Sequence, residues 1–543
     1  MWGTPAGRTT SALRSAAGDS NRTRSDTRAM PDPAERRGTM RTRTRSVPPL
    51  IPARIALVVT AIMTAGGLLG CALSQTADRD VSTAIARYAH ERSQTGETYA
   101  RGTRPVSRTS ATRPTTLAVP ANETEVEPRS LRDYIVLALE QNPDIKAAEE
   151  MARMRAARVP QVTALPDPML MTRTLPEPIR TAEGDNYFNL GIQQKFPVPE
   201  KLDRAGRVAL QETRMAIEEL KRRRLGVIAE VKRAYFRIYI IDRTIEVDLT
   251  NQDLLRGLID AARAQVASGR RRQDDVLRAQ VELSNLESQL VELRQQRQTT
   301  VAMLNRVVSR PPATPVPTLG EYDVRSVDVQ MDALFAAAAE HNPDLQRLKQ
   351  QLERDRQNVE LAKLAYWPDF TLGFEWMDMR PREAFVPPPN PQTGMVPPVN
   401  RMSEDGSDNW AITLSVNIPL WIEKIEAGIR EANSRRMATQ HEFVAAKNRV
   451  NFEIEDALAR VQAQRELAAI FKDTIIPQAQ QAYEVSRASY SAGASDFLFV
   501  IDNWQKWLMF TIQYHRALGE LERSVADLEA AIGLSLSEAE GGS

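Results

Sequence analysis

Glu140-Gln-Asn-Pro-Asp144 recurs 200 residues later as Glu340-His-Asn-Pro-Asp344. Three further pairs follow in the same order: Leu165-Pro-Asp167 with Trp367-Pro-Asp369, Gln194-Lys-Phe-Pro197 with Val416-Asn-Ile-Pro419, and Gly269 before Val276-Leu277 with Gly493 before Val500-Ile501. One such match arises easily by chance, but four ordered matches indicate an internal duplication. The offset grows from 200 to 224, mostly between Asp369 and Pro419, so the second half carries an insertion there.

Each half contains segments in which apolar residues alternate with polar or small ones. The apolar positions are Phe188, Leu190 and Ile192 in the first half, and Phe370, Leu372, Phe374 and Trp376, then Trp410, Ile412, Leu414, Val416 and Ile418, in the second. A period of two over about nine residues predicts a strand with one apolar face. The remaining strand, around residues 169–174, has a weak pattern and is placed mainly by the repeat. The sequence therefore predicts four strands per chain.

Long helices follow each pair of strands. No proline occurs between Pro199 and Pro311, so a helix from Lys201 towards Gly269 could reach roughly 90–100 Å. The returning segments have apolar residues seven apart, which is typical of helices that supercoil against neighbours. These residues are Val276, Leu283 and Leu290 in the first half, and Trp507, Tyr514, Leu521 and Leu528 in the second. Asn142-Pro143 and Asn342-Pro343 mark breaks in helices that begin near Ser130 and Met331.

The single cysteine, Cys71, ends a candidate export signal. Arginines at 41, 43, 45 and 54 precede an uncharged apolar run of about 15 residues, which is too short for a first choice as a spanning helix. The ending Leu68-Leu69-Gly70-Cys71 resembles a bacterial lipobox, which implies acylation of the cysteine. Ala72, where Asp would retain such a protein in the inner membrane, points to the outer membrane. The alternative is a short anchor helix with an incidental cysteine, and a start at Met40 would leave residues 1–39 untranslated.

Composition excludes several functional classes. The 543 residues are 42% apolar and carry a formal net charge of +1, which gives no argument for nucleic acid as a partner. One cysteine excludes an intramolecular disulfide, and the four histidines have no ligand-like spacing. No nucleophile with its base, metal cluster or phosphate loop is apparent. We expect a protein that is not an enzyme and has neither a metal site nor a cofactor.

Four strands cannot close a barrel, and the unpaired edges would not be tolerated in a hydrocarbon layer. Apolar bands of about ten residues are long enough to cross a membrane at a tilt. The chain is therefore expected to share a barrel with copies of itself. Three copies give a barrel of twelve strands, and the long helices give a matching twelve-helix tube. The predicted fold class is mainly α with a small membrane β part, internally duplicated.

Over nearly all of residues 130–533 the sequence resembles the TolC family of outer-membrane efflux proteins. The resemblance rests on the repeated Asn-Pro-Asp, on the strand-to-helix corners Phe196-Pro197 and Asn417-Ile-Pro-Leu420, and on two hairpin tips. It implies a lipid-anchored homotrimer in the bacterial outer membrane, with its helical part in the periplasm. The implied function is that of the exit duct of a tripartite efflux system, with a periplasmic adaptor and an inner-membrane pump, of the RND type, as partners.

The resemblance also assigns site residues. The tips that would contact the adaptor contain Gly269, Arg270, Asp275, Val276, Gly493 and Val500. Half two has Phe499 where the acid of the tip pattern would be. Asp502, and more weakly Asp496, would close the periplasmic mouth, and Cys71 would carry the lipid. A plain helix stop at either glycine, and a solvated charge at Asp502, are the simpler alternatives.

The expected organisation has five parts: an N-terminal extension with signal peptide (1–70), a flexible tether (71–129), repeat one (130–320), repeat two (321–534) and a disordered tail (535–543). Residues 165–170 and 194–201 look similar to the CusC/CzcC-like heavy-metal branch, but the cargo stays open between metal ions, drugs and other compounds. The pump, the adaptor and the resting state of the gate are also open. A lipid-anchored periplasmic adaptor and a coiled-coil scaffold are the alternative functions.

Overall fold

The computed structural model describes residues 72–87, 128, 130–181, 183–269, 272–320, 330–381, 388–396 and 406–536, so Cys71 and Arg270 lie outside the described residues. The first repeat consists of α2 (Leu131–Gln141), α3 (Pro143–Thr163), β1 (Met169–Thr181), β2 (Gly184–Phe196), α4 (Pro199–Ala267) and α5 (Gln273–Val307). The second consists of α6 (Met331–His341), α7 (Pro343–Lys363), the short turn η2 (Leu364–Tyr366), β3 (Phe370–Arg380), β4 (Asn409–Val416), α8 (Ile422–Ile470), the π turn η3 (Phe471–Ile475), α9 (Ile476–Ser491) and α10 (Phe497–Ile532).

The duplication extends to the lengths of the helices. α2 and α6 have 11 residues each, and α3 and α7 have 21 each. α4 has 69 residues, and its counterpart is the continuous run of α8, η3 and α9, with 49, 5 and 16. The π turn ends two residues before Pro477, whose missing N–H removes one bond from the helical ladder. The predicted fold class, mainly α with a small β part and internally duplicated, is confirmed.

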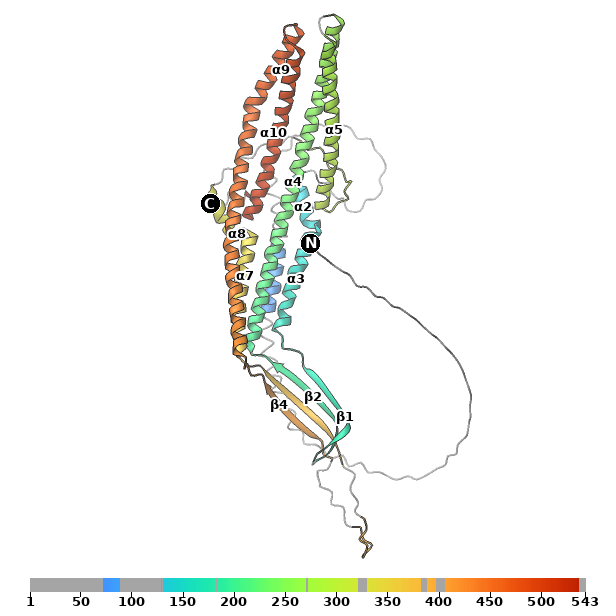
Figure 1. Cartoon of the computed structure of the whole chain (residues 1–543), viewed down its shortest axis with the longest axis vertical. Coiled ribbons are helices and arrows are strands. Elements are labelled where there is room, and N and C mark those ends of the chain that lie inside the picture. Colours follow the sequence, from blue (N-terminus) through green and yellow to red (C-terminus); the bar gives the residue numbers. More distant parts are fainter. Residues whose placement is uncertain are drawn as a thin grey trace, which may run out of the picture. The chain divides into compact units, whose positions relative to one another are not determined.

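The four strands form one antiparallel sheet in the order β1-β2-β3-β4 (Figure 1). Its register aligns apolar residues in rows, so that Ile192 pairs with Phe374 and Phe374 with Ile412. All three are exposed, and cross-strand rows of this kind are the unit of sheet stability. The opposite face is polar, and there Asn189 donates to the Glu375 carboxylate at 2.8 Å. Among the described residues, β1 and β4 each pair on one side only.

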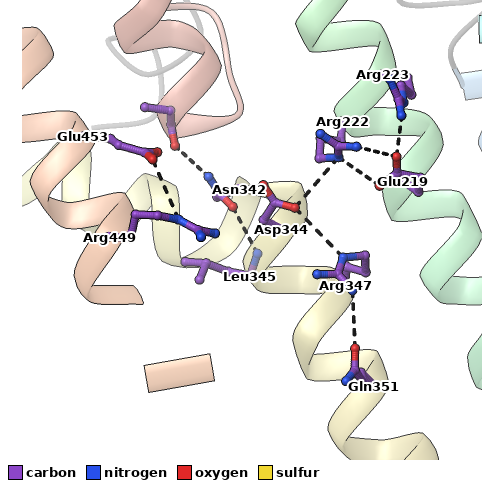
Figure 2. Close-up of polar contacts among 11 residues, drawn as sticks. Glu219, Arg222, Arg223, Asn342, Asp344, Leu345, Arg347, Gln351, Arg449 and Glu453 are labelled. Carbon is purple, nitrogen blue, oxygen red and sulfur yellow. Dashed lines mark hydrogen bonds and ion pairs between the residues drawn. The ribbon is translucent and has the colours of Figure 1, made fainter. Parts of the chain in front are cut away.

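The repeated asparagine begins α3 and α7 in the same way. The Asn142 side-chain oxygen accepts from the Asp144 N–H at 2.9 Å, and that of Asn342 accepts from the Leu345 N–H at 3.0 Å. Each amide also donates at 2.8 Å to a carbonyl near the end of the returning helix of its own repeat, Val307 for Asn142 and Ala531 for Asn342. Figure 2 shows the Asn342 corner. The motif is therefore a helix N-cap that also ties the repeat together.

The two repeats are joined through α4. Arg222 of α4 contacts Glu219 one turn away and, at 3.9 Å, Asp344 of α7 (Figure 2). Hydrogen bonding by Arg222 lowers the pKa of Glu219. Deeper in the core, Lys232 of α4 forms a buried ion pair with Glu529 of α10. These contacts fix the second repeat against the first.

A helix over residues 72–87 corrects the predicted tether in that range. Its Ala77 and Val81 are buried against α3 and α4, with Leu73 and Ile85 packed beside them. A spacing of four from Leu73 to Ile85 places these residues on one helix face. The composition, rich in Ser, Thr and Arg, concealed this pattern. Within the described part of the chain, no helix combines the length and apolar character needed to span a membrane.

Candidate functional site

The turn between α4 and α5 is built on Gly269. α4 ends at Ala267, and the Gly269 N–H donates to the Val266 carbonyl at 2.9 Å. Gly269 has φ +71°, a left-handed conformation that favours glycine, and a Cβ at this position would meet nothing within 4 Å. The conformation of the turn therefore requires glycine, and the space around it is open.

The turn between α9 and α10 repeats this arrangement. Gly493 has φ +81° with open space around it, and its N–H donates to the Tyr490 carbonyl at 3.0 Å. The Ala494 N–H donates to the Ser489 carbonyl at 2.9 Å, which satisfies a second orphan carbonyl of the helix end. Exposed Asp496 is the N-cap residue of α10.

The two hairpins pack against each other just below their turns. The Tyr490 hydroxyl donates to the Asp275 carboxylate at 3.4 Å, and the Trp504 indole donates to Asn251 at 2.8 Å. Val276 and Val500 belong to this shared core and are 3% and 0% exposed. Both therefore support the turns from within, and their role as adaptor contacts stays a prediction. Asp275, which is also buried, takes the same supporting role.

The exposed apolar residues at the tips are the neighbours of the buried ones. Leu277, Leu498 and Phe499 are each more than half exposed. Sequence reasoning missed them, although the heptad pattern contains the signal. Val276 belongs to the heptad row that packs inward, so the apolar residue that follows it falls on another face of the helix.

Asp502 lies one turn of α10 beyond Leu498 and is exposed. Its carboxylate forms an ion pair of 2.7 Å with Lys506, one turn further along the same helix. An exposed pair of this kind adds at most about 1 kcal/mol to stability.

Asp248 is a buried acid in α4 further from the tips. It lies close to Asn251, which accepts the hydrogen bond from Trp504 of α10. It also lies close to Gln252, which donates to Glu287 of α5 at 3.2 Å. Asp248 is 0% exposed, and neither carboxylate oxygen has a hydrogen-bond partner among the described residues. Burial raises the pKa of Asp248 to about 6. Among the described residues, no group of three or more histidine, cysteine or acidic side chains is placed to hold a metal ion.

The comparisons with known proteins agree with this architecture. The family model described as outer membrane efflux protein matches residues 134–309 and 334–534. The cobalt-zinc-cadmium resistance protein CzcC of Cupriavidus metallidurans is 20% identical over 408 residues, which cover 75% of this chain and 90% of CzcC.

Two solved structures have the same fold. The outer-membrane channel OprN superposes with a TM-score of 0.62 at 16% identity, covering 79% of this chain and 99% of OprN. CusC gives a TM-score of 0.62 at 14% identity, covering 78% and 99%. Since the family model matches most of the chain in two consecutive segments, one for each repeat, this protein belongs to the outer membrane efflux protein family.

Proposed function

We propose that this chain is the outer-membrane exit duct of a tripartite efflux system and that three copies form the conducting unit. The observation that carries this proposal is the four-stranded sheet with one exposed apolar face and two edges that pair on one side only. A sheet of this kind is stable in lipid only when its edges are paired by other strands. Three copies supply twelve strands, and the duplicated repeats, near residues 130–320 and 321–534, supply the helices of the periplasmic tube.

The hairpin tips are the proposed site for the periplasmic adaptor. Gly269 and Gly493 supply the turns, and exposed Leu277, Leu498 and Phe499 supply apolar contact area. Arg270, which lies outside the described residues, is also proposed as an adaptor contact. Buried side chains next to the turns fix the geometry of this surface, so the site acts as a rigid end of the duct. An RND-type pump in the inner membrane completes the proposed assembly.

The proposed closure of the periplasmic mouth rests on α10. Asp502, with Asp496 nearer the turn, would approach its copies around the threefold axis. Asp502 forms an ion pair with Lys506. In a ring of three such pairs, opposite charges of neighbouring copies would attract one another, whereas a ring of three aspartates alone would repel. We therefore assign the closing contact to the pair.

The lipid anchor on Cys71 is supported by the start of the described chain. A Cβ added at Gly206 would lie 2.8 Å from Leu73 and 2.4 Å from Thr163, the last residue of α3. Leu73 therefore lies close to the point where α3 leads into β1, and Cys71 is only two residues earlier in the sequence.

Divalent metal ions are the first cargo class to test, because the relative CzcC is named for cobalt, zinc and cadmium resistance. The described residues of the duct contain no cluster of metal ligands. Selection of the cargo is therefore assigned to the pump, and the duct is proposed to conduct what the pump delivers.

The proposal is tested by export in cells that carry the duct together with its adaptor and pump. Gly269→Val or Gly493→Val should abolish export while the protein still reaches the outer membrane, because valine does not tolerate a positive φ. Gly257→Val is the matched control, since Gly257, inside α4, also has open space around it but has no positive φ. Normal export by both tip variants would show that the adaptor binds elsewhere. Loss of export in the Gly257→Val control as well would show that the effect of valine is not specific to the tips.

A further inference from the structure

The α4–α5 hairpin and the α9–α10 hairpin meet along the face of α4 that contains Asp248. On this face, Asn251 accepts the 2.8 Å hydrogen bond from the Trp504 indole of α10, and Gln252 donates to Glu287 of α5. Asp248 precedes both residues by about one helical turn, so its side chain lies between them, at the junction of α4, α5 and α10. Trp504 is 2% exposed, and separation of α10 from α4 would open this junction to water.

The Asp248 carboxyl is buried at this junction without a partner. Among the described residues, neither of its oxygens takes part in a hydrogen bond. Burial alone raises its pKa to about 6, because water no longer stabilises the charged form. The protonated acid is therefore compatible with the packed hairpins, whereas the ionised acid opposes their packing.

The charged residues of α5 do not replace the lost water. Arg297 pairs with Asp242 of α4, and Glu287 bonds Gln252, so the segment of α5 between these two contacts lies opposite Asp248. Its inner charged residues are both exposed: Glu292 and Arg294. None of the four charged residues of this segment forms an ion pair or a hydrogen bond with Asp248.

The nearest charged residues of α10 and of α4 itself are engaged elsewhere. Between Trp504 and Tyr514, α10 has a single charged residue, Lys506. Each charged residue of this part of α10, and of α4 from Arg243 to Asp253 apart from Asp248, has an ion-pair partner in its own helix. The pairs are Lys506 with Asp502, Glu246 with Arg243, and Asp253 with Arg256.

A weak point in the second hairpin lies at the same height as Asp248. Counted back from the turn glycines, Asp248 corresponds to Lys472, which belongs to the π turn η3. The run of α8, η3 and α9 has one residue more than α4, and a π turn accommodates such a residue. Helices kink at π turns and at prolines such as Pro477, so α9 can bend here. The rings of Tyr483 and Trp507 stack at 5.5 Å, so α10 follows α9.

We propose that Asp248 is a pH-sensitive latch between the two hairpins, which stay packed while its carboxyl is protonated and separate more often once it is ionised. The ionised carboxyl regains hydration only when α10 leaves α4, and the π turn allows this movement. The latch operates within one chain and does not depend on the exit-duct role. In the proposed duct, separation of the hairpins would widen the periplasmic end.

The pKa of Asp248 sets the direction and size of the effect. It is about 6 while the hairpins are packed and returns towards the ordinary 3.8 when they separate. Raising the pH therefore favours separation, from near pH 4 until a little above pH 6. Between pH 5 and 7.5 the equilibrium between separated and packed hairpins should shift roughly tenfold towards separation.

The test is hydrogen exchange of the full-length protein in a mild detergent at pH 5 and 7.5, read by mass spectrometry and corrected for the intrinsic exchange rate at each pH. Exchange times are kept too short for global unfolding. In the parent, opening of segments 245–255 and 503–510 should rise roughly tenfold from pH 5 to 7.5. Asp248→Asn should remove this rise, because asparagine does not ionise. The reference segment is α2, which lies outside the hairpins and should not respond.

The matched control is Asp253→Asn, the same substitution in α4 at a carboxylate that is 79% exposed, and it should keep the rise. Trp504→Phe removes the bond to Asn251 and should speed exchange at both pH values. A parent without the rise, a rise that persists in Asp248→Asn, or a rise lost in Asp253→Asn would overturn the latch. An equal response of α2, or unchanged exchange in Trp504→Phe, would overturn it as well. Exchange is measured whether or not the protein conducts, so a parent without channel activity would count against the proposed function alone.

Discussion

Replacing Asp248 by asparagine should stabilise the protein at neutral pH and leave it nearly unchanged in acid. The Asp248 side chain is completely buried, and neither oxygen has a hydrogen-bond partner among the described residues. Burial raises its pKa from the ordinary 3.8 to about 6. Ionised Asp248 therefore opposes folding, whereas a neutral amide of the same shape avoids the cost of burying a charge.

The size of the effect follows from the two pKa values. A rise from 3.8 to about 6 corresponds to a loss of about 3 kcal/mol of folding free energy per chain once the group is ionised. Between these two values the folded chain retains a proton that the unfolded chain releases, so stability falls as the pH rises. The loss begins near pH 4 and is complete a little above pH 6. The asparagine variant lacks this contribution at every pH.

The assay is guanidinium unfolding of the parent and the Asp248→Asn variant in detergent at pH 4.5, 5.5, 6.5 and 7.5, followed by helical circular dichroism. The difference in unfolding free energy between variant and parent should be small at pH 4.5 and approach about 3 kcal/mol per chain at pH 7.5. A variant that is no more stable than the parent at pH 7.5 would refute the reasoning. It would mean that ionised Asp248 finds a partner or water in the assembled protein.

Three further pairs of substitutions test other contacts. Gly533→Ala should lower thermal stability by about 2 kcal/mol or more, because Gly533 has φ +89° and a Cβ there would lie 2.5 Å from the His341 carbonyl oxygen; Gly428→Ala, with open space, should have no such effect. Asn342→Ala should cost about 2 kcal/mol in chemical denaturation, roughly half from the cap and half from the bond to Ala531. Asn342→Asp keeps the cap acceptor and should lose only about half as much, so equal losses would contradict this division. Asp502→Ala should raise the conductance of trimers in planar bilayers, as should Lys506→Met; channels of either variant as closed as the parent would remove the pair from the gate.

The repeat made most of the fold predictable. Ordered landmarks such as Asn142 and Asn342 located equivalent helices, and period-two segments located three strands directly. The boundaries of β1 were not predictable. It extends to Thr181 through Pro176 and Pro178, next to a break in its register with β2. Both prolines lie between Thr174 and Ile179, where the register with β2 is interrupted, so neither N–H is missing from a ladder of paired residues. Only the pairing with β2 beyond this break shows that the strand continues.

The tips were predictable in place but only partly in detail. Gly269 and Gly493 have the positive φ that a tight turn requires. Val276 packs in the core that the two hairpins share, as its heptad row indicates, and its role as an adaptor contact stays a prediction. Burial of Asp248 could not be predicted, because it depends on how α4 meets helices that are distant in sequence. Such proximity follows from the three-dimensional packing and leaves no local pattern.

The central claim is that one chain provides one third of a barrel. Native mass spectrometry of the protein extracted from outer membranes in a mild detergent tests it directly, since it counts the chains in each particle. We expect three chains per particle, because three sheets of four strands pair the edges of β1 and β4 in the proposed closed ring of twelve strands. A particle with a single chain that is stable in the detergent would contradict it, because a sheet of four strands would then remain open in the membrane.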